Sequence, residues 1–126
     1  MTDDARPFRR NSDPSTAHAA AVVTRELEGP KRLVRRNSGR HFALLILAAH
    51  PCGLAGYDVG REMHRVFGFG RTAQDPADIG RRRVNEVAAL GAAARVDNLY
   101  LPNVLTHEAL AAIDAGGEWR PTEGGS

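Results

Sequence analysis

The chain has 126 residues, a mass of 13.6 kDa and a formal net charge of +2, which fits one domain with a single core. Hydrophobic residues make up 42% of it but aromatic residues only 6%, so we expect a small and mainly helical core. Residues 1–40 carry nine basic and five acidic side chains (+4), whereas residues 97–126 carry one basic and five acidic (−4), an asymmetry that suits an anionic partner on one side of the molecule.

Cysteine content and hydropathy disfavour secreted and membrane proteins. Cys52 is the single cysteine, which excludes an internal disulfide and fits a reducing compartment. The first residues contain no apolar run, so we expect no signal peptide. The longest apolar run, residues 42–49, is less than half of a membrane span. The expected location is the cytoplasm, with no membrane partner.

The N-terminal part predicts a flexible arm followed by a helix. Residues 1–12 are polar and form the arm. We expect a helix that ends at Leu27, before Gly29, and starts either with Asp13 as its cap and Pro14 at its first position or with Ser15 or Thr16 as its cap. Its packing face consists of Ala20, Val23 and Leu27.

Residues 31–40 form a basic segment whose secondary structure the sequence leaves open. A loop, a short helix and a strand all fit it. Its five basic residues are Lys31, Arg32, Arg35, Arg36 and Arg40. The segment is the second candidate for contacts with phosphates, although a solvated linker would have the same composition.

The most apolar helix is expected from near Ser38 or Gly39 to His50, where Pro51 stops it. Because it is apolar on nearly every side, it should be the central buried helix. Its expected core residues are Phe42, Leu44, Leu45, Ile46 and Leu47. A shorter helix follows, beginning near Ala55 or Gly56.

A basic amphipathic helix is predicted from about Pro76 to Leu90, after a long turn at residues 67–76. Val84, Val87 and Ala88 share one face at helical spacing. Arg82 and Asn85, three residues apart, lie on the opposite face. One side built for a core and another for phosphates and base edges is what a recognition helix requires.

The remaining chain predicts a hairpin over residues 92–101, with its turn at Asp97 and Asn98. Thr106 is expected to cap a last helix, residues 107–114, with Leu110 and Ile113 facing inward. Residues 115–126 are expected to be a flexible tail in which Trp119 can pack onto the body, which leaves residues 13–114 as the single domain.

The order of these parts resembles winged helix-turn-helix domains, above all small DNA-binding proteins of actinobacterial phages and prophages. Residues 11–20 are similar to the start common in that group, and residues 80–91 are similar to its recognition helix, where arginines precede a closing glycine. The resemblance implies a mainly α fold with a small β-hairpin, a winged helix-turn-helix with an extra N-terminal helix. It implies DNA binding and transcriptional regulation in the bacterial cytosol, and no cofactor.

Two hypotheses follow. In the first, the chain binds double-stranded DNA, with Arg82 and Asn85 toward base edges. The phosphate-contacting residues are then Arg81, Arg83, Lys31, Arg32, Arg35 and Arg36, and Arg71 and Arg95 are further DNA contacts. In the second, the same scaffold binds a host protein, which the long turn, the outward Ile79 and the acidic C-terminal part favour. A homodimer through the N-terminal helix is compatible with both.

Other chemistry is weaker in the sequence. His50 and Cys52, with His41 and His64, lack the paired spacing of a structural zinc site, so we expect Cys52 to be a small buried residue. The glycines around Phe69 lack the strand and the Gly-Lys-Ser/Thr of a phosphate loop. No arrangement of catalytic residues can be argued, so we expect no enzyme.

Overall fold

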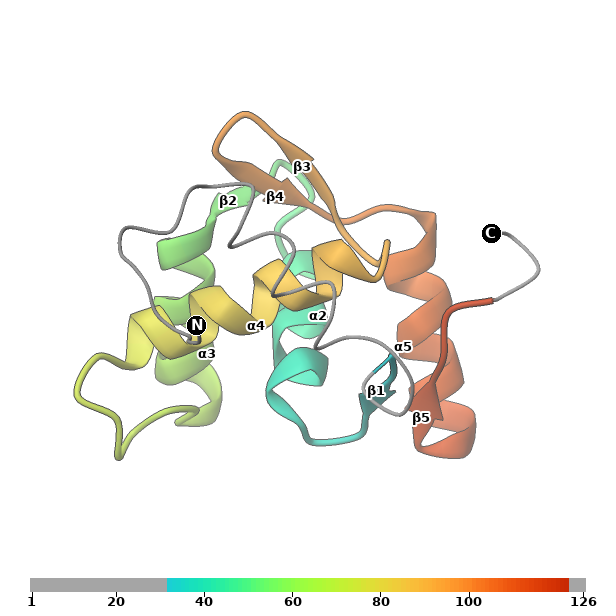
Figure 1. The fold of residues 1–126 in the computed structure, drawn as a ribbon, viewed down its shortest axis with the longest axis horizontal. Helices are drawn as coiled ribbons and strands as arrows, with labels where there is room; N and C mark the ends of the chain where they lie inside the picture. Colours follow the sequence, from blue (N-terminus) through green and yellow to red (C-terminus); the bar gives the residue numbers. More distant parts are fainter. Residues whose placement is uncertain (1–31, 123–126) are drawn as a thin grey trace, which may run out of the picture.

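The computed structural model describes residues 32–122, and the predicted N-terminal arm and helix, together with Lys31, lie outside this part. The described part is mainly α-helical with a small antiparallel sheet (Figure 1). Its elements are β1 (Val34–Arg35), α2 (Gly39–Ala48), β2 (Leu54–Ala55), α3 (Gly56–Phe67), α4 (Pro76–Ala89), β3 (Ala94–Val96), β4 (Leu99–Leu101), α5 (Val104–Gly116) and β5 (Glu118–Trp119).

Helix α2 is the central helix that its composition predicts. It packs against α3, α4 and α5, and Leu44 and Leu47 have no exposed surface. Ser38 caps it, because the Ser38 side chain accepts a hydrogen bond from the backbone N–H of His41 at 3.2 Å. Leu44, Ile46 and Leu47 are buried as expected, whereas Phe42 and Leu45 are half-buried.

Helices α3 and α4 cross in backbone contact. A Cβ atom at Gly60 would lie 2.0 Å from the carbonyl oxygen of Ala77, and one at Gly80 would lie 2.4 Å from the Cα of Gly60. No side chain larger than hydrogen fits at either crossing position. The turn between the helices, residues 68–75, is long as expected, and Asp75 caps α4 ahead of Pro76, as the sequence predicts.

The predicted hairpin is present, and the structure adds a third strand to it. Strands β3 and β4 pair antiparallel with Val96 opposite Leu99, and Asp97 in the two-residue turn has a φ of 56°. Strand β2 joins the other edge of β4, which gives the order β2-β4-β3. The central position of β4 holds Tyr100 between a strand on each side, in the sheet at the top of Figure 1.

The C-terminal part differs from the prediction of a short helix and a flexible tail. Helix α5 starts three residues earlier, because Asn103 is its cap: the Asn103 side chain accepts from the Thr106 N–H at 3.0 Å while the Thr106 hydroxyl accepts from the Asn103 N–H at 2.9 Å. Trp119 is only 4% exposed and lies opposite Val34 in the β1–β5 pair. Burial of that indole side chain orders residues that composition alone marks as a tail.

Two further expectations concern the burial of Cys52 and the absence of a membrane-spanning helix. Cys52 is exposed, not buried, since it lies in the turn between α2 and β2. Within residues 32–122, every helix is too short or too polar to cross a bilayer.

Candidate nucleic-acid interface

Helix α4 buries one side completely and leaves the other open. Ala77, Gly80, Val84 and Val87 face the core. At 100° per residue, Arg82 stands opposite this face, and its side chain is 58% exposed. The exposed side therefore belongs to the residues that the sequence assigns to nucleic-acid contact.

Asp78 lies on the same exposed side and pairs with two of the arginines. One carboxylate oxygen of Asp78 accepts from Arg81 Nε at 3.1 Å and Nη2 at 2.6 Å, and the other lies 3.2 Å from Arg82 Nη2. The hydrogen bond from Arg81 is the main cause that lowers the pKa of Asp78 below its usual value, and the charge of Arg82 acts in the same direction. The carboxylate is thus ionised at neutral pH, and two guanidinium groups share one negative charge.

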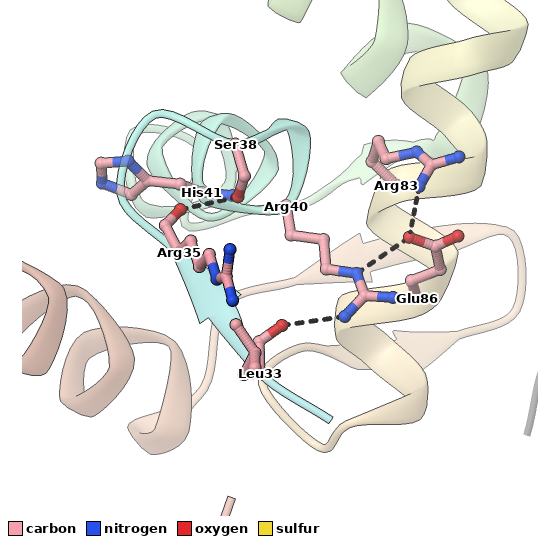
Figure 2. A network of polar contacts seen from close by, with 7 residues as sticks. All are labelled: Leu33, Arg35, Ser38, Arg40, His41, Arg83 and Glu86. Carbon is pink, nitrogen blue, oxygen red and sulfur yellow. Dashed lines mark hydrogen bonds and ion pairs between the residues drawn. The ribbon is translucent and has the colours of Figure 1, made fainter. Parts of the chain in front are cut away.

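The third arginine belongs to a different cluster (Figure 2). Glu86 Oε1 accepts from Arg83 Nη1 and from Arg40 Nε, both at 2.9 Å. Arg40 also donates to the carbonyl oxygen of Leu33 at 2.8 Å, so it connects the start of α2 to α4 and to the chain before β1. Arg83 and Glu86 are three residues apart, so this pair lies along one side of α4. Because the side chains of Glu86 and Arg40 are 13% and 15% exposed, this cluster is mainly structural.

Tyr100 of strand β4 connects the hairpin to Asn85 on α4. The Tyr100 hydroxyl donates to Asn85 Oδ1 at 3.2 Å. On the same ring, the guanidinium carbon of Arg95 lies 5.3 Å from the ring centroid, within the range of a cation–π interaction. This contact fixes the hairpin relative to α4 and brings Arg95 to the side of the helix that carries Asn85.

The basic segment before α2 is placed elsewhere. Arg36 donates through Nη2 to the carbonyl oxygens of Ile113 and Asp114, at 2.7 and 3.0 Å, and so satisfies the C-terminal end of α5. Arg35 is exposed in β1, opposite Glu118, and Arg32 is half-buried. Arg71 is exposed in the turn between α3 and α4.

The structure therefore gathers five of the predicted residues around α4 and the hairpin, namely Arg81, Arg82, Arg83, Asn85 and Arg95. Sequence reasoning missed three residues that organise them. Asp78 was detectable, because it stands three and four residues before Arg81 and Arg82. Arg40 and Tyr100 act through long-range contacts, which no local pattern announces.

A groove of about 830 Å³ runs along the exposed side of α3. It is lined in part by His50, Leu54, Tyr57, Arg61, Arg65 and Pro76. The Tyr57 hydroxyl donates to Asp75, a contact that is the main cause raising the pKa of Tyr57. Tyr57 is 40% exposed, and near the end of α3 Val66 and Phe67 are 49% and 37% exposed. The groove also carries Asp58 and Glu62, which pair with Arg61 and Arg65, so its lining is charged as well as aromatic.

Metal binding and base stacking have little support in the described part. Within residues 32–122, no three His, Cys, Asp or Glu side chains come together as a metal site. Phe67 stacks on Phe42 with ring centroids 4.5 Å apart, and Phe69 meets Phe42 edge-on at 6.0 Å. These rings therefore contact one another within the protein, although Phe67 keeps 37% of its surface exposed.

Comparison with models of protein families, with curated proteins and with solved structures finds no significant match.

Proposed function

We propose that the protein binds double-stranded DNA, with α4 as a recognition helix in the major groove and the β3–β4 hairpin beside it. The observation that carries the proposal is the division of α4 into a buried apolar side and an open side with the exposed Arg81 and Arg82 and the half-buried Asn85. The order helix, strand, helix, turn, helix, hairpin, with the sheet order β2-β4-β3, supports a winged helix-turn-helix. The resemblance to phage and prophage proteins supports transcriptional regulation in the bacterial cytoplasm as the process.

Dimensions favour this mode of binding. Helix α4 has 14 residues, so it is about 21 Å long. A B-form major groove about 12 Å wide accepts one such helix. Arg95 on the hairpin then lies beside the helix, where a neighbouring phosphate would be.

The ion pairs on α4 reduce the charge offered to DNA without cancelling it. Four arginines (Arg40, Arg81, Arg82 and Arg83) face two carboxylates (Asp78 and Glu86), which leaves +2. Exposed pairs between neighbours on a helix contribute little to stability and are screened by salt. Binding of an arginine to a DNA phosphate is favoured in addition by the release of the counterions around that phosphate. Arg81 and Arg82 can therefore exchange Asp78 for phosphate, which moves Arg82 from the base-edge role that the sequence suggests to a backbone contact, whereas Arg83 is held by Glu86.

The test is selection of bound duplexes from a random pool, with a triple alanine variant of residues 81–83 as the control. The proposal expects enrichment of a defined sequence by the wild type and none by the variant, with circular dichroism showing that the variant is folded although it lacks the Arg83–Glu86 ion pair. Equal enrichment by the two proteins, or none by either at low salt, would reject it.

A protein partner is the second candidate function, favoured by the groove on α3, which Tyr57 lines, and by the exposed Val66 and Phe67 at the end of that helix. Exposed apolar and aromatic side chains of this kind are common at protein interfaces. This candidate expects a complex that survives nuclease treatment and is lost in a Phe67→Ser variant, with no shift of duplex at low salt.

A further inference from the structure

Tyr100 connects the hairpin to α4 through a side chain that has little freedom. It is 4% exposed, and it lies in the central strand β4, opposite Leu54 on one side and Arg95 on the other. A Cβ atom at Gly56 would stand 3.0 Å from Tyr100 Cε1, so the ring is also packed against the start of α3. The hydroxyl is thereby fixed at Asn85 Oδ1, 3.2 Å away.

The hydrogen bond changes what Asn85 can offer to a base. A free asparagine side chain presents one acceptor and one amide donor group, and the pair matches the N6 donor and N7 acceptor of adenine. Here Oδ1 accepts a hydrogen bond from the Tyr100 hydroxyl, and the amide cannot turn its oxygen away from the hairpin without breaking that bond. With its oxygen held by Tyr100, the half-buried Asn85 side chain has its NH2 group, which can only donate, left to meet a base.

We infer that Tyr100 is a specificity-determining residue, which makes Asn85 select guanine instead of adenine at one position of the bound duplex. This inference rests on the proposed function. Guanine is favoured because it presents two adjacent acceptors in the major groove, N7 and O6. Adenine would leave its N6 donor facing the Asn85 donor, and cytosine presents only a donor there.

Arg95 strengthens the same arrangement. Its guanidinium group lies over the Tyr100 ring, 5.3 Å from the centroid, and its side chain is exposed. One ring thus positions a base-reading donor on α4 and a cation on the hairpin. The Tyr100→Phe substitution removes the hydroxyl alone and keeps the ring for Arg95, so it isolates the contact with Asn85.

The experiment compares duplex selection by the wild type, Tyr100→Phe, Asn85→Ala and the double variant. The wild type should enrich guanine at one position. Tyr100→Phe should shift that position toward adenine by at least about fivefold in relative affinity, because Asn85 regains its acceptor. Asn85→Ala should lose preference there, and adding Tyr100→Phe to it should change nothing more.

A measurement on the DNA side needs no substitution of a buried residue. Replacing the selected guanine by 7-deazaguanine, which lacks the N7 acceptor, should weaken binding of the wild type by about fivefold or more and leave Asn85→Ala unaffected. Three outcomes would overturn the inference while the proposed function stands, provided that binding is sequence-specific. They are a preference of the wild type for adenine at that position, an unchanged preference in Tyr100→Phe, and no effect of 7-deazaguanine. Absence of duplex binding by every protein would overturn both.

Discussion

Replacing Asp78 by asparagine should tighten DNA binding, which is the reverse of what a substitution in a binding helix usually does. The carboxylate of Asp78 accepts from Arg81 at 2.6 and 3.1 Å and lies 3.2 Å from Arg82. It therefore competes with phosphate for both guanidinium groups. With asparagine in its place, the local charge of these three residues rises from +1 to +2.

The size of the effect follows from counterion release. One additional neutralised phosphate steepens the slope of log K against log salt by about 0.9, which at 0.1 M salt corresponds to roughly eightfold tighter binding. The pairs that are lost are exposed, since the side chains of Arg81 and Arg82 are 44% and 58% accessible. The variant should therefore stay folded.

The assay is fluorescence anisotropy with a labelled duplex over a series of salt concentrations. Asp58→Asn is a matched control, because Asp58 stands in the first turn of α3 and pairs with Arg61 three residues on, as Asp78 pairs with Arg81 on α4. Both substitutions raise the net charge by one. If Asp78→Asn changes affinity and slope no more than Asp58→Asn, the exposed side of α4 does not contact phosphate.

Three further predictions concern stability. Glu86→Gln should lower the free energy of unfolding in urea by about 2 kcal/mol, because it removes the charge from the buried acceptor that Arg40 and Arg83 share. An unchanged urea midpoint would contradict a structural role for this cluster. Gly60→Ala should lower the free energy of unfolding by about 3 kcal/mol or more, or prevent folding, because its Cβ would lie 2.0 Å from the Ala77 oxygen. Thermal melting followed by circular dichroism checks this, and a Tm within a few degrees of the wild type would refute the backbone contact. Burial and the charge of Arg36 lower the pKa of His41 below 6.5, so the unfolded chain binds the proton more readily and the stability from His41 is lost as pH falls below about 6.5. The fall in Tm between pH 7 and pH 5.5 should be smaller in His41→Asn than in the wild type, and equal falls would contradict it.

Sequence patterns predicted elements where local signals are strong. Asp75 before Pro76 marks the start of α4, and the apolar run after Ser38 marks α2. The turn at Asp97 also followed from residue type, since Asp tolerates positive φ better than most residues. These features depend on neighbours in the chain, so a single sequence contains them.

Long-range contacts could not be predicted in the same way. The pairing of β5 with β1 depends on Trp119 meeting Val34, which lies 85 positions earlier in the chain. The site shows the same division. The arginines of α4 and their exposed side followed from helical spacing, whereas the hydrogen bond from Tyr100 to Asn85 depends on how the hairpin folds back onto α4.

The most direct test of DNA binding by α4 is the salt dependence of duplex affinity for the wild type, Arg82→Ala and Arg61→Ala. Arg61 is the matched control, since its side chain is 63% exposed and paired with an aspartate on α3, while that of Arg82 is 58% exposed and paired with one on α4. Log K should fall linearly with log salt, with a slope shallower by about 0.9 in Arg82→Ala and unchanged in Arg61→Ala. A wild-type affinity that does not depend on salt, or equal slopes for all three proteins, would contradict it.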